Sequence, residues 1–462
     1  MSKKIVLVIP NSIWMNKDHL PSIGIGYLAA CLEKEKYEVM ILDCEAESLN
    51  EIEAAEWIER TKPHAVGVTA TSHSRFWTIS LIREIKKRID VLIIAGGIHF
   101  SLTAQDAMRN IRELDVVVKG EGETTTIEFL NTFFSGGDLA HIKGIVFRSN
   151  DGNILETPTR QFQTNLNSLP DPAWHLFNMN KYNAILEGCK SGEKTIGLMS
   201  SRGCPFNCIF CSNKAFWKQK LRFLEPDRFV NQLIKLNKEY GFFNFDFWDD
   251  TFTANKNHVY DICSRLLATD FSMNIYFRSR VETVDKDLLT MLKKVGGFAI
   301  GYGIESGSQR ILDRISKNIK VEQAINTVKQ SIDMGFLVKA FFMTSLPGET
   351  IEDVEKTYKM VDKLKKYGRD RIRISYGIPT LIYPGTDLEE LAKTNGALDR
   401  NFSWNSECHF SKAEQYGLNP IIPYFENETI TLDEIMAYKE NRQLGKLKKI
   451  KNYFSYLLSL RH

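Results

Sequence analysis

The stretch Ser201-Arg202-Gly203-Cys204-Pro205-Phe206-Asn207-Cys208-Ile209-Phe210-Cys211 places three of the chain's 8 cysteines on one short loop. Three thiolates can bind three irons of a cubic [4Fe–4S] cluster, which leaves the fourth iron without a protein ligand. An iron that is open in this way can bind and reduce a small molecule. A zinc site is the alternative, but it needs a fourth ligand. No histidine or further cysteine lies within a dozen residues of these three cysteines, so the cluster is favoured.

Length, composition and charge limit the class of protein. A chain of 462 residues predicts two or three domains. The net charge of +3 gives no indication of nucleic-acid binding, and no apolar run reaches the roughly 18 residues of a membrane span. The N-terminal run Ile5–Pro10 is too short for the core of a signal peptide. We therefore expect a cytoplasmic protein, in which clustered cysteines indicate metal rather than disulfide.

Residues 1–140 alternate short apolar runs with helical segments. The apolar runs are expected strands: Ile5–Pro10, Tyr37–Asp43, Ala65–Thr69, Val91–Ala95 and Asp115–Val118. This alternation predicts a doubly wound, parallel α/β sheet. Such sheets bind ligands beyond the carboxyl ends of their strands, where this chain has Thr69, Ser72, Gly96, Gly97, Gly120 and Gly122. No Gly-x-Gly-x-x-Gly follows the first strand, so a dinucleotide site is not expected.

Residues 141–190 form a predicted connector. The turn Asn150-Asp151-Gly152-Asn153 lies between two β-rich runs and predicts a hairpin. Pro170 and Pro172 then predict an extended linker. The connector leads into a second region of alternating strands and helices.

Residues 191–390 contain six strand-like runs separated by helical segments, which predicts an incomplete version of the eight-stranded barrel. The runs are Ile196–Ser200, Asn244–Trp248, Asn274–Arg278, Phe298–Tyr302, Val338–Met343 and Arg371–Tyr376. In such barrels the chemistry lies at the carboxyl ends of the strands. Each run is followed by a loop with distinctive groups, and the cysteine loop is the first of these.

The cysteine spacing, with aromatic Phe210 before the last cysteine, resembles that of the radical S-adenosylmethionine (SAM) superfamily. Residues 1–140 resemble the cobalamin-binding domain of many such enzymes, in Ile23–Ala29, Ala95–His99 and Gly120–Thr124. The Asp-x-His-x-x-Gly loop that supplies a cobalt-ligating histidine in other cobalamin proteins is absent after Asp43, as it often is in radical SAM relatives. His73 or His99 could ligate cobalt, but a loop histidine is more often structural.

The resemblance implies a [4Fe–4S] cluster on Cys204, Cys208 and Cys211 whose open iron chelates the methionine part of SAM. It also implies a SAM site. Asp249 and Asp250 are expected to bind the ammonium group of SAM, and Arg278 or Arg280 its carboxylate. Glu305 is expected to bind the ribose, Met343 and Ile378 to contact the adenine, and Ser306 to belong to the same SAM site. The alternatives are a helix cap for the two aspartates, surface positions for the arginines, a buried salt bridge for Glu305 and plain core for Met343 and Ile378. The residues that the resemblance implies for cobalamin are Thr69, Ser72, Gly96, Gly97, Gly120 and Gly122.

The implied chemistry is reductive cleavage of SAM to methionine and a 5′-deoxyadenosyl radical, which abstracts hydrogen from an unreactive carbon. Cobalamin-dependent methyl transfer to a carbon of a small molecule or lipid is the favoured outcome, and a second SAM would then remethylate the cobalamin. The alternative is cyclisation or rearrangement of a substrate such as a tetrapyrrole, without methyl transfer. A non-catalytic corrinoid or iron–sulfur carrier is a remote alternative. A low-potential donor such as flavodoxin or ferredoxin is the expected protein partner, and nucleic acid is not expected.

Residues 391–462 are predicted to be mainly helical. Thr431 and Glu434 form a capping-box pattern at the start of a helix. Leu447, Ile450, Phe454 and Leu457 fall at helical spacing among lysines. This pattern is typical of a helix at a membrane surface or of a helix packed on the barrel with a basic solvent face, and we favour the packed helix. Cys408 is isolated, so a second iron–sulfur cluster is not expected.

Overall fold

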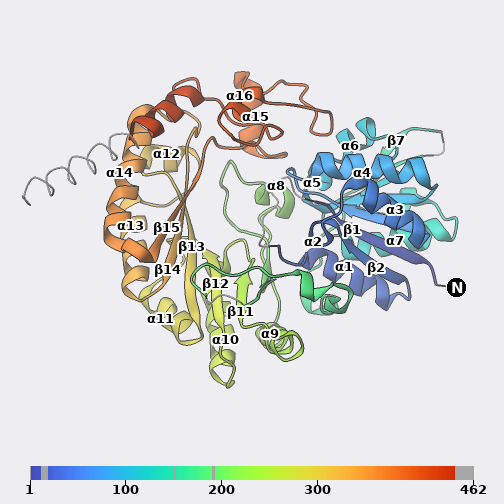
Figure 1. Ribbon diagram of the computed structural model, residues 1–462, viewed down its shortest axis with the longest axis horizontal. Coiled ribbons are helices and arrows are strands. Elements are labelled where there is room, and N and C mark those ends of the chain that lie inside the picture. Colours follow the sequence, from blue (N-terminus) through green and yellow to red (C-terminus); the bar gives the residue numbers. More distant parts are fainter. Residues whose placement is uncertain (1, 12–18, 150, 190–192, 443–462) are drawn as a thin grey trace, which may run out of the picture.

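The computed structural model describes residues 2–11, 19–149, 151–189 and 193–442. Figure 1 shows two α/β units side by side, with the N-terminal unit in blue and cyan and the second in green to orange. The segment that carries α15 and α16 runs from the second unit toward the first, across one end of both (Figure 1).

The first sheet has seven strands among the described residues, in the order β2-β1-β3-β4-β5-β6-β7. Five are parallel: β1 (Lys4–Ile9), β2 (Glu38–Asp43), β3 (Ala65–Thr69), β4 (Leu92–Gly96) and β5 (Val116–Val118). The predicted hairpin is present as β6 (Ile145–Arg148) and β7 (Ile154–Glu156), but both strands extend this sheet in antiparallel pairing. The first residues of the predicted connector are therefore part of the first sheet.

Helices cover both faces of the first sheet, because successive strand residues point to opposite faces. Ile5 and Leu7 of β1 lie in one apolar core with α1 (Ile23–Lys34) and α7 (Gly122–Phe134). Val6 and Val8 lie in the other core. That second core includes residues of α2 (Cys44–Glu47), α3 (Glu51–Thr61), α4 (Arg75–Arg88), α5 (Gly97–Leu102) and α6 (Ala104–Asn110). The doubly wound parallel fold predicted from the sequence is confirmed.

The proline linker is packed against the first domain and is not a free tether. The backbone N–H of Ala173 donates to the carbonyl of Gly26 in α1 at 3.0 Å. A methyl group at Gly26 would come within 2.9 Å of Pro172 Cβ, so only glycine allows this approach. The linker contains short 3₁₀ turns at Leu166–Ser168, Trp174–Leu176 and Met179–Lys181. Its Trp174 and Phe177 join the same apolar core as the strands of both sheets.

The second sheet has six parallel strands in the part of the chain that the structure describes, in the order β15-β14-β13-β12-β11-β8. They are β8 (Thr195–Leu198), β11 (Asn244–Phe247), β12 (Asn274–Ser279), β13 (Gly297–Glu305), β14 (Leu337–Met343) and β15 (Ile372–Gly377). The helices between them are α9 (Pro226–Tyr240), α10 (Lys256–Leu267), α11 (Lys286–Lys294), α12 (Gln309–Arg314), α13 (Val321–Asp333) and α14 (Ile351–Gly368). The predicted partial barrel is confirmed, and its carboxyl ends lie at one edge.

The described part of the C-terminal region, residues 391–442, is less helical than the sequence predicts. After α15 (Asp387–Asn395), residues 396–431 are mostly irregular, with the short α16 (Ser411–Gln415). The predicted capping box is present: the Thr431 N–H donates to Glu434 Oε2 at 2.8 Å, and residues 432–442 are helical. Irregular backbone is stabilised here by contacts with the first domain, such as Arg75 Nε donating to the Trp404 carbonyl at 2.8 Å. Leu447, Ile450, Phe454 and Leu457 lie outside the described residues. A bilayer-crossing helix, long and apolar enough for that role, is not found among the described residues.

Candidate active site

The cysteine loop lies at the carboxyl end of β8. A short antiparallel pair, β9 (Ser201–Arg202) with β10 (Arg222–Phe223), encloses it. Cys208 is buried, and Cys204 and Cys211 are half-buried. Burial raises the pKa of Cys204, and it raises the pKa of Cys211 to about 12. Free thiols at these positions keep their protons, so binding of iron must displace them. Three soft sulfur donors on one shielded loop fit an iron–sulfur cluster.

Arg280 lies against the cysteine loop and not in the open mouth of the barrel. Its guanidinium is 3.9 Å from the centre of the Phe206 ring, and Nη1 donates to Cys208 Sγ at 3.3 Å. Nη2 donates to the Lys317 carbonyl, and Nε bonds Glu282. The side chain is buried. All three nitrogens are therefore engaged with protein groups, and the assignment of the SAM carboxylate to Arg280, the alternative to Arg278, stays a prediction.

Glu305 forms a buried ion pair with Lys317. A register shift in β13 between Gly303 and Glu305 gives Glu305 a φ of +71°, which turns its side chain away from the regular strand positions. Its Oε1 lies 3.0 Å from Lys317 Nζ, and the two side chains are 9% and 7% exposed. The ammonium of Lys317 also lies over the ring of Phe210, 6.0 Å from its centre. The salt bridge that was an alternative for Glu305 is present, and it adjoins the cysteine loop.

The adjacent residues Asp249 and Asp250 have opposite environments. Asp249 is fully buried and accepts from the Ser200 N–H at 3.1 Å, from Ser200 Oγ at 2.8 Å and from Ser201 Oγ. It fixes the end of β8 and is not free to bind an ammonium group. Asp250 is exposed, and it bonds the Asn213 side chain and the Gly203 N–H, on either side of the cysteines. Desolvation of the carboxylate by the protein atoms around it, together with the negative charge of the neighbouring Asp249, raises the pKa of Asp250 to about 6.

Arg278 and Ser306 are held by neighbouring protein groups. Arg278 forms a two-point ion pair with Asp246, at 2.8 and 3.2 Å, and its side chain remains 40% exposed. Ser306 is fully buried, and its Oγ bonds Thr357 Oγ1 at 3.2 Å. Ser306 therefore fixes the loop after β13, and its place in the SAM set stays a prediction. The exposed edge of Arg278 can still take a ligand.

Met343 and Ile378 lie at the ends of adjacent strands but on different surfaces. Met343 packs, half-buried, against the core that contains the strands of the barrel. Ile378 packs against Val354, Tyr358 and Ile435, between α14 and the C-terminal region. The predicted adenine contact of Ile378 is therefore not supported by its position.

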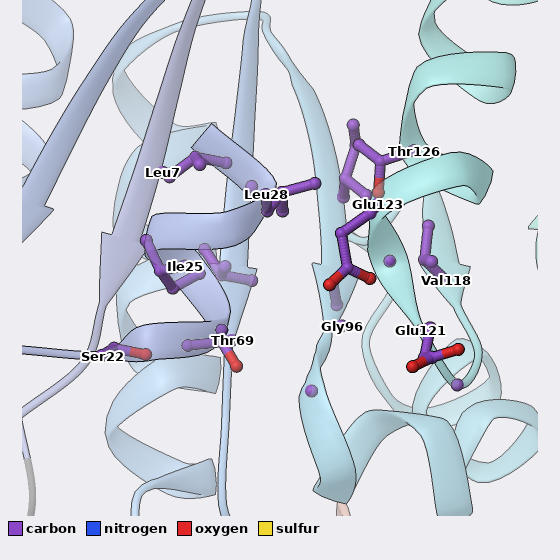
Figure 2. A pocket seen from close by; sticks show the side chains of 18 of the residues that line it. Leu7, Ser22, Ile25, Leu28, Thr69, Gly96, Val118, Glu121, Glu123 and Thr126 are labelled. Carbon is purple, nitrogen blue, oxygen red and sulfur yellow. The ribbon is translucent and has the colours of Figure 1, made fainter. Parts of the chain in front are cut away.

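A cavity of about 250 Å³ opens at the carboxyl ends of the first sheet (Figure 2). Its lining includes Thr69, Gly96, Gly97, Gly120 and Gly122, five of the six residues predicted for cobalamin. Figure 2 shows Ile25 and Leu28 of α1, with Ser22 just before this helix, on one side and Glu121 and Glu123 on the other. Met199, Arg202, Phe216 and Trp217 of the second domain complete the wall. The cavity therefore lies between the two domains.

Glycines shape this cavity for close approach to the backbone. A methyl group at Gly97, whose φ is +82°, would lie 2.3 Å from Thr69 Oγ1, so no larger residue fits there. At Gly24 and Gly120 a methyl group would meet nothing within 4 Å. The absence of side chains at these two positions is what leaves room in the cavity.

Ser72 faces away from this cavity, toward His99. Ser72 Oγ donates to His99 Nδ1 at 3.1 Å, and His99 Nε2 donates to Asn405 Oδ1 at 3.3 Å. Burial lowers the pKa of His99 to about 3, so its imidazole is neutral. His73 bonds Tyr383 Oη at 3.0 Å and Asn419 Nδ2 at 3.2 Å. Both rings are thus engaged with protein groups on both nitrogens and do not line the cavity.

Four charged residues join the two domains beside the cavity. Arg202 Nη1 lies 2.8 Å from Glu121 Oε1, and Arg202 Nη2 lies 2.7 Å from Glu123 Oε1. Arg222 pairs with Glu121 at 2.8 Å. Burial alone would raise the pKa of Glu121, but hydrogen bonds and charge from Arg222 and Arg202 lower it overall. We call Arg202, Arg222, Glu121 and Glu123 the interdomain clamp.

Sequence reasoning missed the roles of Lys317 and of the clamp. Lys317 follows Glu305 by 12 residues, after a helix, and this spacing carries no recognised signal. Glu121 and Glu123 were identified only as part of a glycine-containing run. The signal in the sequence is the pair of acidic residues among glycines at the end of a strand. Their partners Arg202 and Arg222 lie about 80 and 100 positions further along the chain. Such pairing is not visible in a single sequence.

Two family models match the chain. The model of the radical SAM superfamily matches residues 198–361, and the model of the B12 binding domain matches residues 17–130. An uncharacterized methyltransferase of Pyrococcus horikoshii is 34% identical over 401 residues, which cover 86% of this chain and 84% of that protein. The anaerobic magnesium-protoporphyrin IX monomethyl ester cyclase of Rubrivivax gelatinosus is 27% identical over 74% of this chain and 61% of its own length.

A solved structure has the same arrangement of domains. The radical S-adenosylmethionine methyltransferase TsrM of Kitasatospora setae superposes with a TM-score of 0.71, at 18% identity. The match covers 85% of this chain and 77% of that one. With 85% of the chain covered, the similarity in fold includes most of both domains.

Proposed function

This chain belongs to the radical SAM superfamily, to the group with a B12-binding domain, and we propose that it catalyses cobalamin-dependent methylation of a carbon atom in a small molecule, a lipid or a tetrapyrrole. The observation that carries the proposal is the shared wall of the two sites. Arg202 lines the glycine-lined cavity, and it lies two residues before Cys204 in the cysteine loop. A corrinoid held in the cavity and a cluster held on the loop would therefore be neighbours.

Cys204, Cys208 and Cys211 would hold the cluster, and the groups around them would hold SAM. Asp250 is the available acid at the mouth for an ammonium group, and the exposed edge of Arg278 can pair with a carboxylate. Lys317 is a further cation close to Phe210 of the loop. When bound, the cluster and SAM supply one-electron cleavage of the sulfonium, and cobalamin supplies transfer of the methyl group. The chain contributes binding, orientation and exclusion of water.

Thr69, Gly96, Gly97, Gly120 and Gly122 would hold cobalamin at the first sheet. The cavity opens between the two domains, so it would take the arm of the corrinoid that reaches the strand ends. The glycines let that arm approach the backbone, and the apolar side chains of Ile25 and Leu28 cover it. The His73 and His99 rings are held elsewhere, so we assign no cobalt ligand to either.

The alternative is cyclisation or rearrangement without methyl transfer, which the cyclase among the relatives favours. The fate of the methyl group separates the two reactions. Under the methylation proposal, the label of methyl-labelled SAM appears in the product. Under the alternative, SAM is consumed and the product carries no label.

The test is anaerobic reconstitution of the full chain with iron, sulfide and hydroxocobalamin. We expect about one [4Fe–4S] cluster and one corrinoid per chain, measured by iron content and absorbance. With SAM and a low-potential reductant, 5′-deoxyadenosine should form, and the C204A/C208A/C211A variant should form none. A flavodoxin or a ferredoxin is the proposed physiological donor. Formation of no 5′-deoxyadenosine by cluster-loaded protein would contradict the radical reaction, and failure to retain a corrinoid would contradict the methylation.

A further inference from the structure

Arg280 contacts a cluster ligand directly, although it is neither a ligand nor exposed to the barrel mouth. Its Nη1 donates to Cys208 Sγ at 3.3 Å, within the range of a hydrogen bond to sulfur. The side chain is 5% exposed, so water does not compete for this contact. A buried guanidinium therefore lies beside the cysteine loop.

Three further contacts fix the orientation of this guanidinium. Its plane lies over the Phe206 ring at 3.9 Å, a distance that allows a strong cation–π interaction in a desolvated site. Nη2 donates to the Lys317 carbonyl, and Nε bonds Glu282. The planar fork of arginine can make all these bonds together, whereas a lysine ammonium cannot match the geometry. The direction of Nη1 toward Cys208 is thus determined by the fold.

We infer that Arg280 is a positioning residue that sets the reduction potential of the iron–sulfur cluster through its hydrogen bond to Cys208. Reduction adds one electron, supplied by a low-potential donor, to the cluster and its thiolate ligands. A hydrogen bond and a positive charge at a ligand sulfur stabilise this more negative state, and they raise the potential. Arg280 thereby makes the cluster easier to reduce. This inference rests on the cluster of the proposed function.

The contacts of Arg280 also link the cluster loop to the SAM side of the barrel. The carbonyl that Arg280 bonds belongs to Lys317, whose ammonium pairs with Glu305 at 3.0 Å. The Ile209 N–H donates to the Ile315 carbonyl at 3.2 Å, so the same segment also holds the backbone of the loop. Displacement of this segment would change the bond to Cys208.

The test is a redox titration of the reconstituted cluster, followed by electron paramagnetic resonance, in the absence of SAM. For R280Q we expect a lower midpoint potential, corresponding to a shift of about tenfold in the reduction equilibrium, which is about 59 mV for a one-electron couple. R280K keeps the charge but loses the fork, so we expect a smaller shift in the same direction. R265Q, which changes a surface arginine paired with Asp227, is the control and should leave the potential unchanged.

A second measurement reports the hydrogen bond itself. In the wild-type protein with ¹⁵N-labelled arginine, pulsed resonance should detect a weak nitrogen coupling to the reduced cluster, and R280Q should lack it. Unchanged potentials in both R280Q and R280K would overturn the inference. Loss of the cluster from both variants, with the fold intact by circular dichroism, would also overturn it, because Arg280 would then hold the loop without tuning it. Absence of a cluster from the wild-type protein would instead contradict the proposed function.

Discussion

Replacement of Arg202 by methionine should open the junction between the two domains. Arg202 is 9% exposed, and its two carboxylate partners Glu121 and Glu123 are 9% and 10% exposed. Removing one member of a buried pair leaves an uncompensated charge, which costs about 3–5 kcal/mol. Glu121 keeps Arg222 at 2.8 Å, so the cost falls mainly on Glu123. We therefore expect the low end of this range, about 3 kcal/mol.

Hydrogen exchange measures this change locally, which avoids the assumption that a multidomain chain unfolds in one step. A loss of about 3 kcal/mol corresponds to roughly 100-fold faster exchange, because about 1.4 kcal/mol is a factor of ten. The effect should be confined to peptides from β9 and from the first turns of α7. In the double variant R202M/E123L the ion pair is replaced by apolar groups, so protection should largely return.

Lys214 provides the matched control, since it forms an ion pair of similar length but greater exposure. Its Nζ lies 2.6 Å from Asp387 Oδ2, and the side chains are 36% and 46% exposed. Exposed pairs contribute about 0–1 kcal/mol, so K214M should accelerate exchange by less than tenfold. Equal exchange rates in R202M and K214M would refute the argument that burial makes the clamp strong.

Three further predictions concern backbone strain and pH. A non-glycine residue with a left-handed backbone costs about 1–2 kcal/mol. G97A should destabilise the first domain by more than this, because its methyl group would also lie 2.3 Å from Thr69 Oγ1. G136A, with a φ of +71° and open space around the added methyl group, should show only the backbone cost in thermal unfolding, and equal losses of stability in the two variants would contradict the clash at Gly97. The clamp should weaken in acid, because the pKa of Glu121 is lowered from 4.5: its contribution is present above pH 4.5 and is lost as pH falls through the folded-state value. The measurement is the protection factor of β9, corrected for the intrinsic exchange rate at each pH, and a protection factor that shows no acid-induced fall would contradict this. Burial raises the pKa of Glu349 to about 8, so the native state holds a proton that the unfolded state releases above pH 4.5. The free energy of unfolding should therefore fall from pH 5 to pH 8. In urea denaturation E349Q should remove that fall, and an equal dependence of stability on pH in the two proteins would refute the argument.

The alternation of apolar runs and helices was sufficient to predict both sheets. The run Ala65–Thr69 was placed correctly to the residue, and the carboxyl ends of the parallel strands meet as expected. The hairpin was also predicted, but its membership in the first sheet was not, because pairing between β5 and β6 is a long-range contact. In the C-terminal region, contacts such as that of Arg75 with Trp404 replace regular hydrogen bonding, and helical periodicity in the sequence does not report them.

The partners of individual side chains were much harder to predict than the fold. Asp249 and Asp250 are neighbours, yet one is fully buried and the other exposed, because consecutive residues after a strand point in different directions. Arg278 and Arg280 share a strand face in principle, but β12 ends at Ser279, so Arg280 turns toward the cysteine loop. A small change of backbone direction at a strand end therefore decides which protein groups a side chain contacts.

The cysteine loop is held from both domains, and its geometry therefore depends on their docking. Arg202, two residues before Cys204, is bound by Glu121 and Glu123 of the first domain. At Cys208 the loop is bound by Arg280, which the barrel fixes through Glu282 and Lys317. Without the first domain, Arg202 and Arg222 would lose the carboxylates that neutralise them. The cavity for the second cofactor and the support of the cysteine loop are thus parts of one structure.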